Sequence, residues 1–441
     1  MKQMKRTLFL TLTALLVCFS PPVFADVTPG ETIDKSNWQK AEGLVPPFLL
    51  DWVKNGEWVL NTGKLNFDSK EYQPPAFLKA RDEKLNKGKY GLGENKGIID
   101  IKSGEKYPRD IMGFPFPDID ENDPDAGYKV AYNAYYFRSQ RSALGNYTVN
   151  IQQQNINRKG KVEKELTAFR IYYFPDLTKT KHDMFNISGY SAPYNLAGSS
   201  AMTHVTTNPE LKMNRWTYIP SLRKVRRLSD VIRGSEAGGG TTVGIDDTWA
   251  GGPYYKIVDA EYKLISKKEM LVPFYSADPI KLTREKDGYS VTGSDIGEGR
   301  RLAMGYETEG WTGAPWAYTN VVWVKKEVFE IEYVAKDPKY RYGPCRGWFT
   351  ADQFNSVYRA NTDLKNNYWK GGVYCLSSFE NEDGSFRFTS GTISRVVYDA
   401  KRDLATMAWS VLHPKGRMEL LLENSIDPGI FTQGGYMKFS K

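Results

Sequence analysis

The sequence has few of the residues from which catalytic and metal sites are usually built. Among its 441 residues there are only 3 histidines and 3 cysteines. The histidines, His182, His204 and His413, are scattered without the spacing of a metal-ligand motif. The sequence also lacks a nucleophile elbow, a zinc-peptidase helix and a phosphate-binding loop. We therefore predict that the protein is not an enzyme and that it uses no metal ion or cofactor.

Long apolar segments are equally scarce, and the one clear run lies at the N-terminus. Basic residues precede an apolar run at residues 8–19, and Ala25 closes a site that a signal peptidase would recognise. A membrane-spanning helix needs about 20 apolar residues, more than this run supplies. We predict a signal peptide at residues 1–25, cleaved after Ala25, and therefore a location in the periplasm of a Gram-negative bacterium.

The low cysteine content bears on the exported protein. Removal of the signal peptide takes Cys18 with it, so that Cys345 and Cys375 remain. We favour soluble export over a lipid anchor at Cys18, because the preceding residue, Val17, is bulky. Two cysteines in an exported protein predict one disulfide, with two buried free thiols as the alternative.

Aromatic residues and glycine, in contrast, are abundant. The chain has 28 Tyr, 11 Trp and 39 Gly, and its many short alternating runs favour a β-rich fold. The formal net charge is +8 and falls to +5 once the signal peptide with Lys2, Lys5 and Arg6 is removed. This mild excess, in an exported protein, predicts no nucleic-acid partner.

The most distinctive stretch runs from Asn214 to Leu228. A period of two places Trp216 and Tyr218 on one side of a strand. Pro220 interrupts the strand, because proline cannot donate to a sheet ladder. The returning arm is very basic. We predict a hairpin whose first arm is aromatic and whose second arm carries Arg223, Lys224, Arg226 and Arg227.

Other segments have the patterns of ordinary elements. Apolar spacing and end signals predict helices within residues 46–56 and 127–138. Alternation or apolar runs predict strands at residues 98–101, 169–174, 321–324, 328–334 and 387–398, and a pair of strands within 262–275.

The hairpin also carries a resemblance. Trp216-x-Tyr218-x-Pro220, followed by basic residues 223–227, resembles the signature of a bacterial family of unknown function whose members are often named outer-membrane lipoprotein-sorting proteins. That family is similar to the LolA/LolB lipoprotein carriers. Further matching pieces are residues 113–117, 246–247 and 263–274.

The resemblance implies a fold and a division of the chain. The implied fold is mainly β, a strongly curved antiparallel sheet of the LolA type, a half-barrel, with a few covering helices and extra strands. Because the chain is longer than one carrier domain, we predict two parts after the signal peptide. Residues 26–146 form an N-terminal helical and loop segment packing on the sheet, and residues 147–441 form the curved sheet domain with a C-terminal extension.

The expected ligand site lies around the hairpin. Arg223, Arg226 and Arg227 suit phosphate or carboxylate headgroups, although pairing with nearby acidic residues is the simpler alternative. The acidic candidates for this pairing are Asp230, Glu236, Asp246 and Asp247. For the aromatic residues, packing in the core is the alternative to ligand contact. The full set of candidate ligand-binding residues is Trp216, Tyr218, Arg223, Arg226, Arg227, Asp246, Asp247 and Trp249.

These observations predict a periplasmic carrier or binding protein for a lipid, a lipoprotein or another hydrophobic ligand. The resemblance implies that it holds the ligand in the concave side of the half-barrel, between an inner-membrane transporter and an outer-membrane protein. A periplasmic glycan-binding protein or an outer-membrane-assembly scaffold is the alternative, because exposed Trp and Tyr also stack on sugars.

Overall fold

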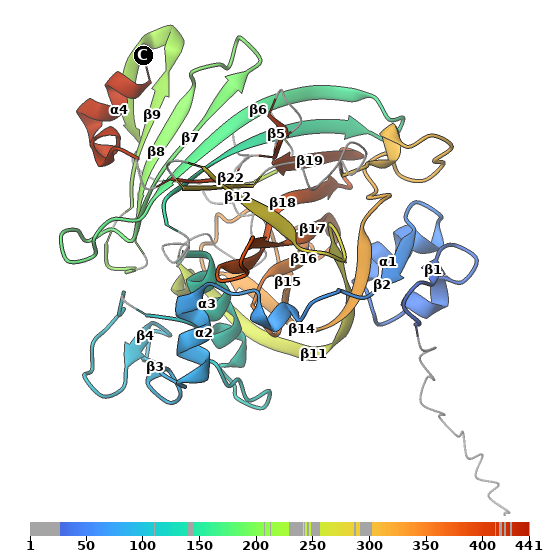
Figure 1. Ribbon diagram of the computed structural model, residues 1–441, viewed down its shortest axis with the longest axis horizontal. Coiled ribbons are helices and arrows are strands. Elements are labelled where there is room, and N and C mark those ends of the chain that lie inside the picture. Colours follow the sequence, from blue (N-terminus) through green and yellow to red (C-terminus); the bar gives the residue numbers. More distant parts are fainter. Residues whose placement is uncertain are drawn as a thin grey trace, which may run out of the picture.

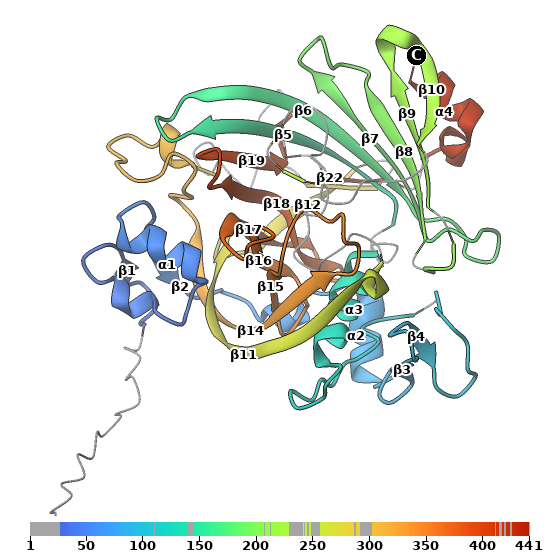
Figure 2. The same cartoon turned by 180° about the vertical axis from the view of Figure 1, so that it is seen from behind.

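The computed structural model of the protein describes residues 27–109, 111–139, 145–206, 208–211, 213–228, 241, 243–244, 247, 256–285, 288–291, 302–410, 412–413, 417–418, 420–423 and 426–440. The predicted signal peptide lies outside the described residues. Figures 1 and 2 show the chain from opposite sides.

Strands dominate this part of the chain, and 18 of them belong to one sheet. The strands of the sheet are β1 (Thr32–Ile33), β2 (Leu60–Gly63), β5 (Tyr147–Asn157), β6 (Val162–Tyr173), β7 (Met184–Ala192), β8 (Ser200–Val205), β9 (Asn214–Ile219), β10 (Lys224–Leu228), β11 (Ala260–Phe274), β12 (Ile280–Glu285), β13 (Gly288–Val291), β14 (Val322–Ala335), β15 (Cys345–Thr350), β16 (Ser356–Thr362), β17 (Tyr368–Asn381), β18 (Arg387–Asp399), β19 (Leu404–Ser410) and β22 (Leu420–Glu423). Two small hairpins, β3 (Tyr90–Leu92) with β4 (Ile98–Asp100) and β20 (Leu412–His413) with β21 (Arg417–Met418), stand apart.

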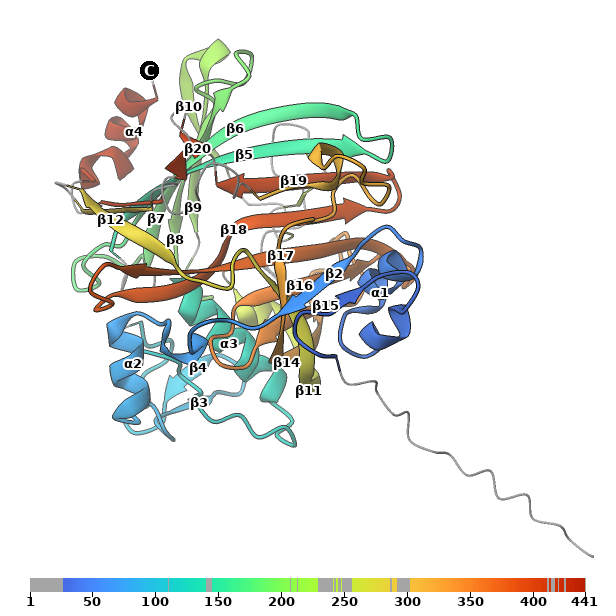
Figure 3. The ribbon, with the colours of Figure 1, turned by 45° about the vertical axis from the view of Figure 1, so that its right-hand side comes forward.

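Most neighbouring strands of the sheet are antiparallel. Their registers give the order β11, β14, β15, β16, β17, β18, β19, β5, β6, β7, β8, β9, β10. Parallel pairs occur where β17 meets β11 and β12, and where β2 meets β14. The sheet bends strongly, and β5 and β6 arch over its other strands in Figures 1 and 3. The predicted mainly β fold with a strongly curved sheet is confirmed, with the parallel pairs as an addition.

Four α-helices accompany the sheet in the described residues: α1 (Pro47–Lys54), α2 (Pro75–Asp82), α3 (Ala126–Ser139) and α4 (Gln433–Phe439). Helix α1 begins with a proline at its first position and is followed by Gly56 at a φ of 73°, which is the predicted punctuation. Both predicted helices are therefore present, as α1 and α3.

The two faces of the sheet carry separate cores. On the first face, α1 and the segment at residues 302–321 cover β14–β19, with Trp52, Trp316 and Trp348 buried between them. On the second face, α3 covers β11, β14 and β15 through tyrosines and Phe329. The interior of this part of the sheet is thus filled by the protein's own side chains.

The predicted strand pair within residues 262–275 is a single strand. Residues 262–274 belong to β11, whose polar middle continues the ladder, so that Lys267 pairs with Phe329 of β14 and forms an ion pair with Glu327 at 3.3 Å. A bulge between Leu264 and Ser266 lets β11 bend without ending. The predicted strands at 321–324 and 328–334 likewise merge into β14, because β11 pairs with it along its whole length.

The predicted disulfide is wrong. Cys345 and Cys375 are both free and buried. Cys345 lies on β15 and belongs to the core of the second face, whereas Cys375 lies on β17 and belongs to the core of the first face, with β16 between the two strands. Side chains on opposite faces of a sheet and two strands apart cannot reach disulfide geometry. Burial raises the pKa of the Cys375 thiol, as expected for a structural cysteine.

The N-terminal segment does more than pack on the sheet. It contributes β1 and β2, and Trp323 of β14 lies beside Thr62 of β2. The predicted boundary between residues 146 and 147 therefore divides a single continuous sheet. Among the described helices, none has the length and apolar character needed to cross a membrane.

Candidate ligand-binding surface

The hairpin of β9 and β10 presents two different surfaces. In its register, Arg226 lies opposite Thr217 and Arg227 lies opposite Trp216. Because side chains alternate along a strand, Arg226 and Arg227 point to opposite faces of the sheet. The predicted hairpin at residues 214–228 is confirmed. The basic side chains of its second arm lie on both faces of the sheet.

The aromatic side of the hairpin is covered by the C-terminal segment. Tyr218 is buried and Trp216 partly buried on the first face, where both pack with η8 (Pro428–Phe431) and α4. His204 of β8 donates from Nε2 to the Phe431 carbonyl oxygen at 2.8 Å. In this structure the two aromatic residues belong to the protein's own packing, and their contact with a ligand stays a prediction.

The second face of the same strands is cationic. Arg215 and Arg226 occupy diagonal positions on neighbouring strands, which places their Cα atoms roughly 7–8 Å apart. Tyr190 of β7 stands on this face as well. Burial raises the pKa of Tyr190, while the charges of Arg170 and Arg215 act in the opposite direction.

An apolar zone adjoins these arginines on the second face. Thr203 of β8 lies opposite Arg215, and Val205 follows two residues later on the same side. Val205 is 1% exposed and belongs to a cluster with Phe174, Met213 and Phe386 packed against it. The buried members of this zone are Tyr147, Val149, Ile151, Tyr172, Met184, Val205 and Ala408.

The exposed cations of the hairpin have few partners. Arg227 donates to Asn214 Oδ1 at 2.6 Å and lies over the Trp216 ring. Arg223 occupies the left-handed region, with φ at 48°, at the turn. In the described part of the chain, neither Arg223 nor Arg226 forms an ion pair.

Asp247 does not pair with these arginines. Its carboxylate accepts hydrogen bonds from Lys370 at 2.9 Å and from Asn361 at 2.8 Å, and lies 3.8 Å from Arg359. The Tyr342 hydroxyl adds another donor at 2.9 Å. The predicted pairing of Asp247 with the hairpin is therefore wrong, because β16 and β17 supply buried cations much closer to it.

The electrostatics of this cluster keep Asp247 ionised. Asp247, Lys370 and Arg359 are each at most 2% exposed. Burial acts to raise the pKa of Asp247, but Lys370 and Arg359 outweigh it and bring the pKa to about 2. Asp247 thus works as an anchor between its own segment and the second face of the sheet. Asp246 and Trp249, the other two candidates of that segment, lie outside the described residues.

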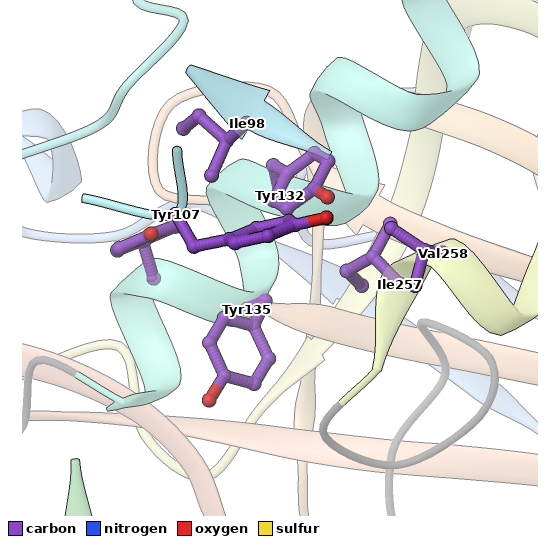
Figure 4. A pocket seen from close by; sticks show the side chains of 7 residues that line it. Ile98, Tyr107, Tyr132, Tyr135, Ile257 and Val258 are labelled. Atoms are coloured by element: carbon purple, nitrogen blue, oxygen red, sulfur yellow. The ribbon is translucent and has the colours of Figure 1, made fainter. Parts of the chain in front are cut away.

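A small pocket lies between α3 and the β3–β4 hairpin. Its seven side chains bound about 300 Å³, part of it open solvent, and Figure 4 shows Tyr107 and Tyr132 facing Ile257 and Val258. The Tyr132 hydroxyl donates to the Lys96 carbonyl oxygen at 2.9 Å, so it already has a hydrogen-bond partner within the protein. The lining residues are Ile98, Tyr107, Tyr132, Tyr135, Tyr136, Ile257 and Val258. No group of three or more His, Cys, Asp or Glu side chains among the described residues could hold a metal ion.

Comparison with known proteins identifies the family. The profile of a family described as "protein of unknown function (DUF1329)" matches residues 32–407. The chain belongs to the DUF1329 family. This membership confirms the resemblance inferred from the hairpin signature. No curated protein matches the chain.

Solved structures similar to this DUF1329 protein include a family member from Desulfovibrio piger, with 13% identity, a TM-score of 0.46 and coverage of 71% of this chain and 99% of that one. A domain from Vibrio parahaemolyticus, named for outer membrane lipoprotein sorting, has 11% identity, a TM-score of 0.43 and coverage of 70% and 99%. A LolA superfamily protein from Nitrosomonas europaea has 12% identity, a TM-score of 0.37 and coverage of 69% and 97%.

Sequence reasoning missed part of the cationic surface of this DUF1329 protein. Arg170 and Arg215 were not among the candidates, although alternation alone places Arg215 on the side of β9 opposite Trp216. Arg170 could be found only through the pairing of β6 with β7, which the sequence does not state. The same holds for Lys370 and Arg359, which lie more than 100 residues after Asp247.

Proposed function

We propose that the protein is a non-enzymatic periplasmic carrier that binds an anionic amphiphile on the second face of strands β5–β10. The observation that supports this function is the meeting of two zones on one face. Arg215 lies diagonally beside Val205, where the apolar zone begins, and Arg226 is the diagonal neighbour of Arg215 on the side away from this zone. A phosphate or carboxylate headgroup would meet the arginines, while the acyl chain runs along the apolar zone.

The chemistry of each zone suits one half of such a ligand. An arginine presents a planar fork of donors that matches phosphate and carboxylate oxygens. Each methylene removed from water contributes about 0.8 kcal/mol. The apolar zone is packed in this structure, so the acyl chain replaces contacts now made by Phe174, Met213 and Phe386. Ligand uptake therefore involves movement of those covering side chains.

The glycan-binding alternative has less support. Sugar binding needs exposed aromatic platforms, and Trp216 and Tyr218 are covered by the C-terminal segment. No tryptophan is among the exposed large apolar side chains of the described residues, and the exposed tyrosines, Tyr194 and Tyr368, lie on different elements. Delivery from an inner-membrane transporter to an outer-membrane protein completes the proposed role.

The test compares single variants of two neighbouring arginines whose side chains lie on opposite faces of the sheet. Arg226→Ala should raise the Kd for a fluorescent anionic fatty acid about tenfold, because one charge-assisted contact is lost. Arg227→Ala should change it by less than about twofold, since Arg227 points to the first face. The double variant Lys263→Ala/Lys268→Ala, on β11, removes exposed charge elsewhere and serves as the control. Equal affinities for all of these proteins would contradict the assignment.

The cargo class comes from a second measurement. Native mass spectrometry of the protein purified from the periplasm, followed by organic extraction, should find a stoichiometric lipid or other amphiphile. A protein that is free of such a molecule, and that also resists loading with fatty acids and phospholipids, would rule out the carrier function.

A further inference from the structure

The tips of the β7–β8 and β9–β10 hairpins expose large apolar side chains beside the C-terminal helix. Tyr194, on the β7–β8 turn, is 98% exposed. Leu222, on the β9–β10 turn, is 44% exposed, and Met437 and Phe439 of α4 are 39% and 41% exposed. We name the two turns together with α4 the tip.

Contacts between the three segments make the tip one surface. A side chain at Gly198, on the β7–β8 turn, would come within 3.2 Å of Pro220 on the β9–β10 turn. Ser200, at the start of β8, lies 2.9 Å from the Tyr436 hydroxyl of α4. Figures 1, 2 and 3 all place the C-terminal end of α4 beside the β9–β10 hairpin.

The charge of the tip has a single sign. Residues 189–200, 214–228 and 433–440 contain no Asp or Glu. Lys224 of β10 and Lys438 of α4 are exposed, and so is Arg223 at the turn. In the described part of the chain none of these three cations forms an ion pair. A cationic edge strand also prevents strand-to-strand aggregation, but that role does not call for exposed Tyr, Leu, Met and Phe side chains at the adjacent turns.

We propose that the tip docks this protein onto the surface of a bilayer that contains anionic lipids. Lysine and arginine are attracted to the negative surface of such a bilayer, and apolar side chains on turns insert at the headgroup level. Tyrosine is favoured at that depth, because its ring is apolar and its hydroxyl stays in water. A tip built from two turns and a helix end inserts shallowly, which suits a reversible contact with a membrane.

This inference goes beyond the proposed function and does not depend on it. The ligand surface uses Arg215 and Arg226 on the second face, whereas the tip uses side chains at the turns and on α4. A protein that docks without carrying a ligand, or that carries one without docking, would be distinguished by two separate assays.

The experiment is flotation of the full mature protein with vesicles of phosphatidylcholine, alone or mixed with phosphatidylglycerol. The protein should float with the mixed vesicles, much less with phosphatidylcholine alone, and less at high salt. The double variant Tyr194→Ser/Leu222→Ser should bind the mixed vesicles about tenfold more weakly. The double variant Arg223→Glu/Lys438→Glu should lose most of the binding through charge reversal.

The matched control is Leu364→Ser, on the β16–β17 turn, where the leucine is 70% exposed but lies far from the tip in the fold. It should bind vesicles like the unchanged protein. Circular dichroism should show the same fold for all variants, and the Tyr194→Ser/Leu222→Ser protein should keep its affinity for a soluble anionic fatty acid. Failure of the unchanged protein to float with mixed vesicles, or equal loss in the Leu364→Ser control, would overturn the docking role.

Discussion

Asp247 contributes to stability because it is a buried carboxylate between two buried cations. Its hydrogen bonds from Lys370, Asn361 and Tyr342 satisfy it fully. Removing it leaves Lys370 and Arg359 without their carboxylate in a place that water does not reach. We expect Asp247→Ala to lower the free energy of unfolding by about 3–5 kcal/mol, measured by urea denaturation. Glu42→Ala, at an exposed position, should change it little.

The same carboxylate gives this prediction a pH signature. Its pKa is lowered on folding to about 2, so its contribution is complete above the pKa of the unfolded carboxyl, about 4. This contribution is lost as the pH falls from about 4 towards 2. In that range the unfolded carboxyl takes up a proton and the folded one does not, so protonation favours the unfolded state. Asp247→Asn should show a shallower loss of stability over this range. An identical acid dependence of the variant would contradict the assigned anchor.

For single residues, the sequence predicted the face of the sheet on which a side chain lies better than it predicted which residues are in contact. Alternation correctly separated Trp216 and Tyr218 from their neighbours on β9. Alternation could not predict that Asp247 contacts Lys370. That contact depends on how the segment containing Asp247 packs against β16 and β17, which lie more than 100 residues later in the chain. The sequence likewise does not reveal how the strands pair. It therefore predicted a disulfide between the two cysteines, although their strands place them on opposite faces of the sheet.

The C-terminal element is held to the sheet by a histidine that must stay neutral. His204 donates to the Phe431 carbonyl oxygen, and its ring lies 5.0 Å from the ring of His182. Burial lowers the pKa of His204 to about 4, and His182 contributes in the same direction, while the bond to Phe431 opposes them. The docked segment thus favours the uncharged ring.

This arrangement predicts that acid loosens the C-terminal segment. The folded pKa lies below the ordinary value near 6.5, so the contribution of His204 is complete above that value and is lost as the pH falls towards about 4. Because the intrinsic rate of amide exchange itself changes with pH, the quantity to compare is the protection factor. The protection factors of the amides in residues 426–440 should fall as the pH is lowered from 6.5 to 4, the window that the two pKa values set. His204→Gln keeps a donor but does not titrate, and the protection factors of the same amides in this variant should be nearly independent of pH in this range. A fall in protection of equal size in the variant would exclude His204 as the cause.

Element prediction succeeded where local signals were sufficient. The proline and glycine around α1 define its ends, and the proline of the β9–β10 turn marks the hairpin. Element prediction failed at β11 and β14, each of which was predicted as two strands, because polar residues in the middle of a strand resemble a turn. Lys267 and its neighbours stay in the strand because β14 pairs with them throughout, and only the partner strand reveals this.

At the scale of the whole molecule, the continuity of the sheet decides how the chain folds. Strand β2 of the N-terminal segment pairs with β14, and α1 fills the first face under β14–β19. Composition and resemblance could suggest an N-terminal part and a sheet domain. They could not show that the first part completes the core of the second, because this depends on long-range pairing.

Shared strands and a shared core predict a single cooperative unfolding unit. Tryptophan fluorescence and far-ultraviolet circular dichroism should give coincident urea transitions. Leu49→Ala, which removes a fully buried side chain of α1, should cost about 2–5 kcal/mol and shift both transitions together. Leu85→Ala, at a position that is 43% exposed in the same segment, should shift neither. Two separate phases, with Leu49→Ala moving only the first, would mean that the N-terminal segment unfolds as an independent unit despite the strand it contributes.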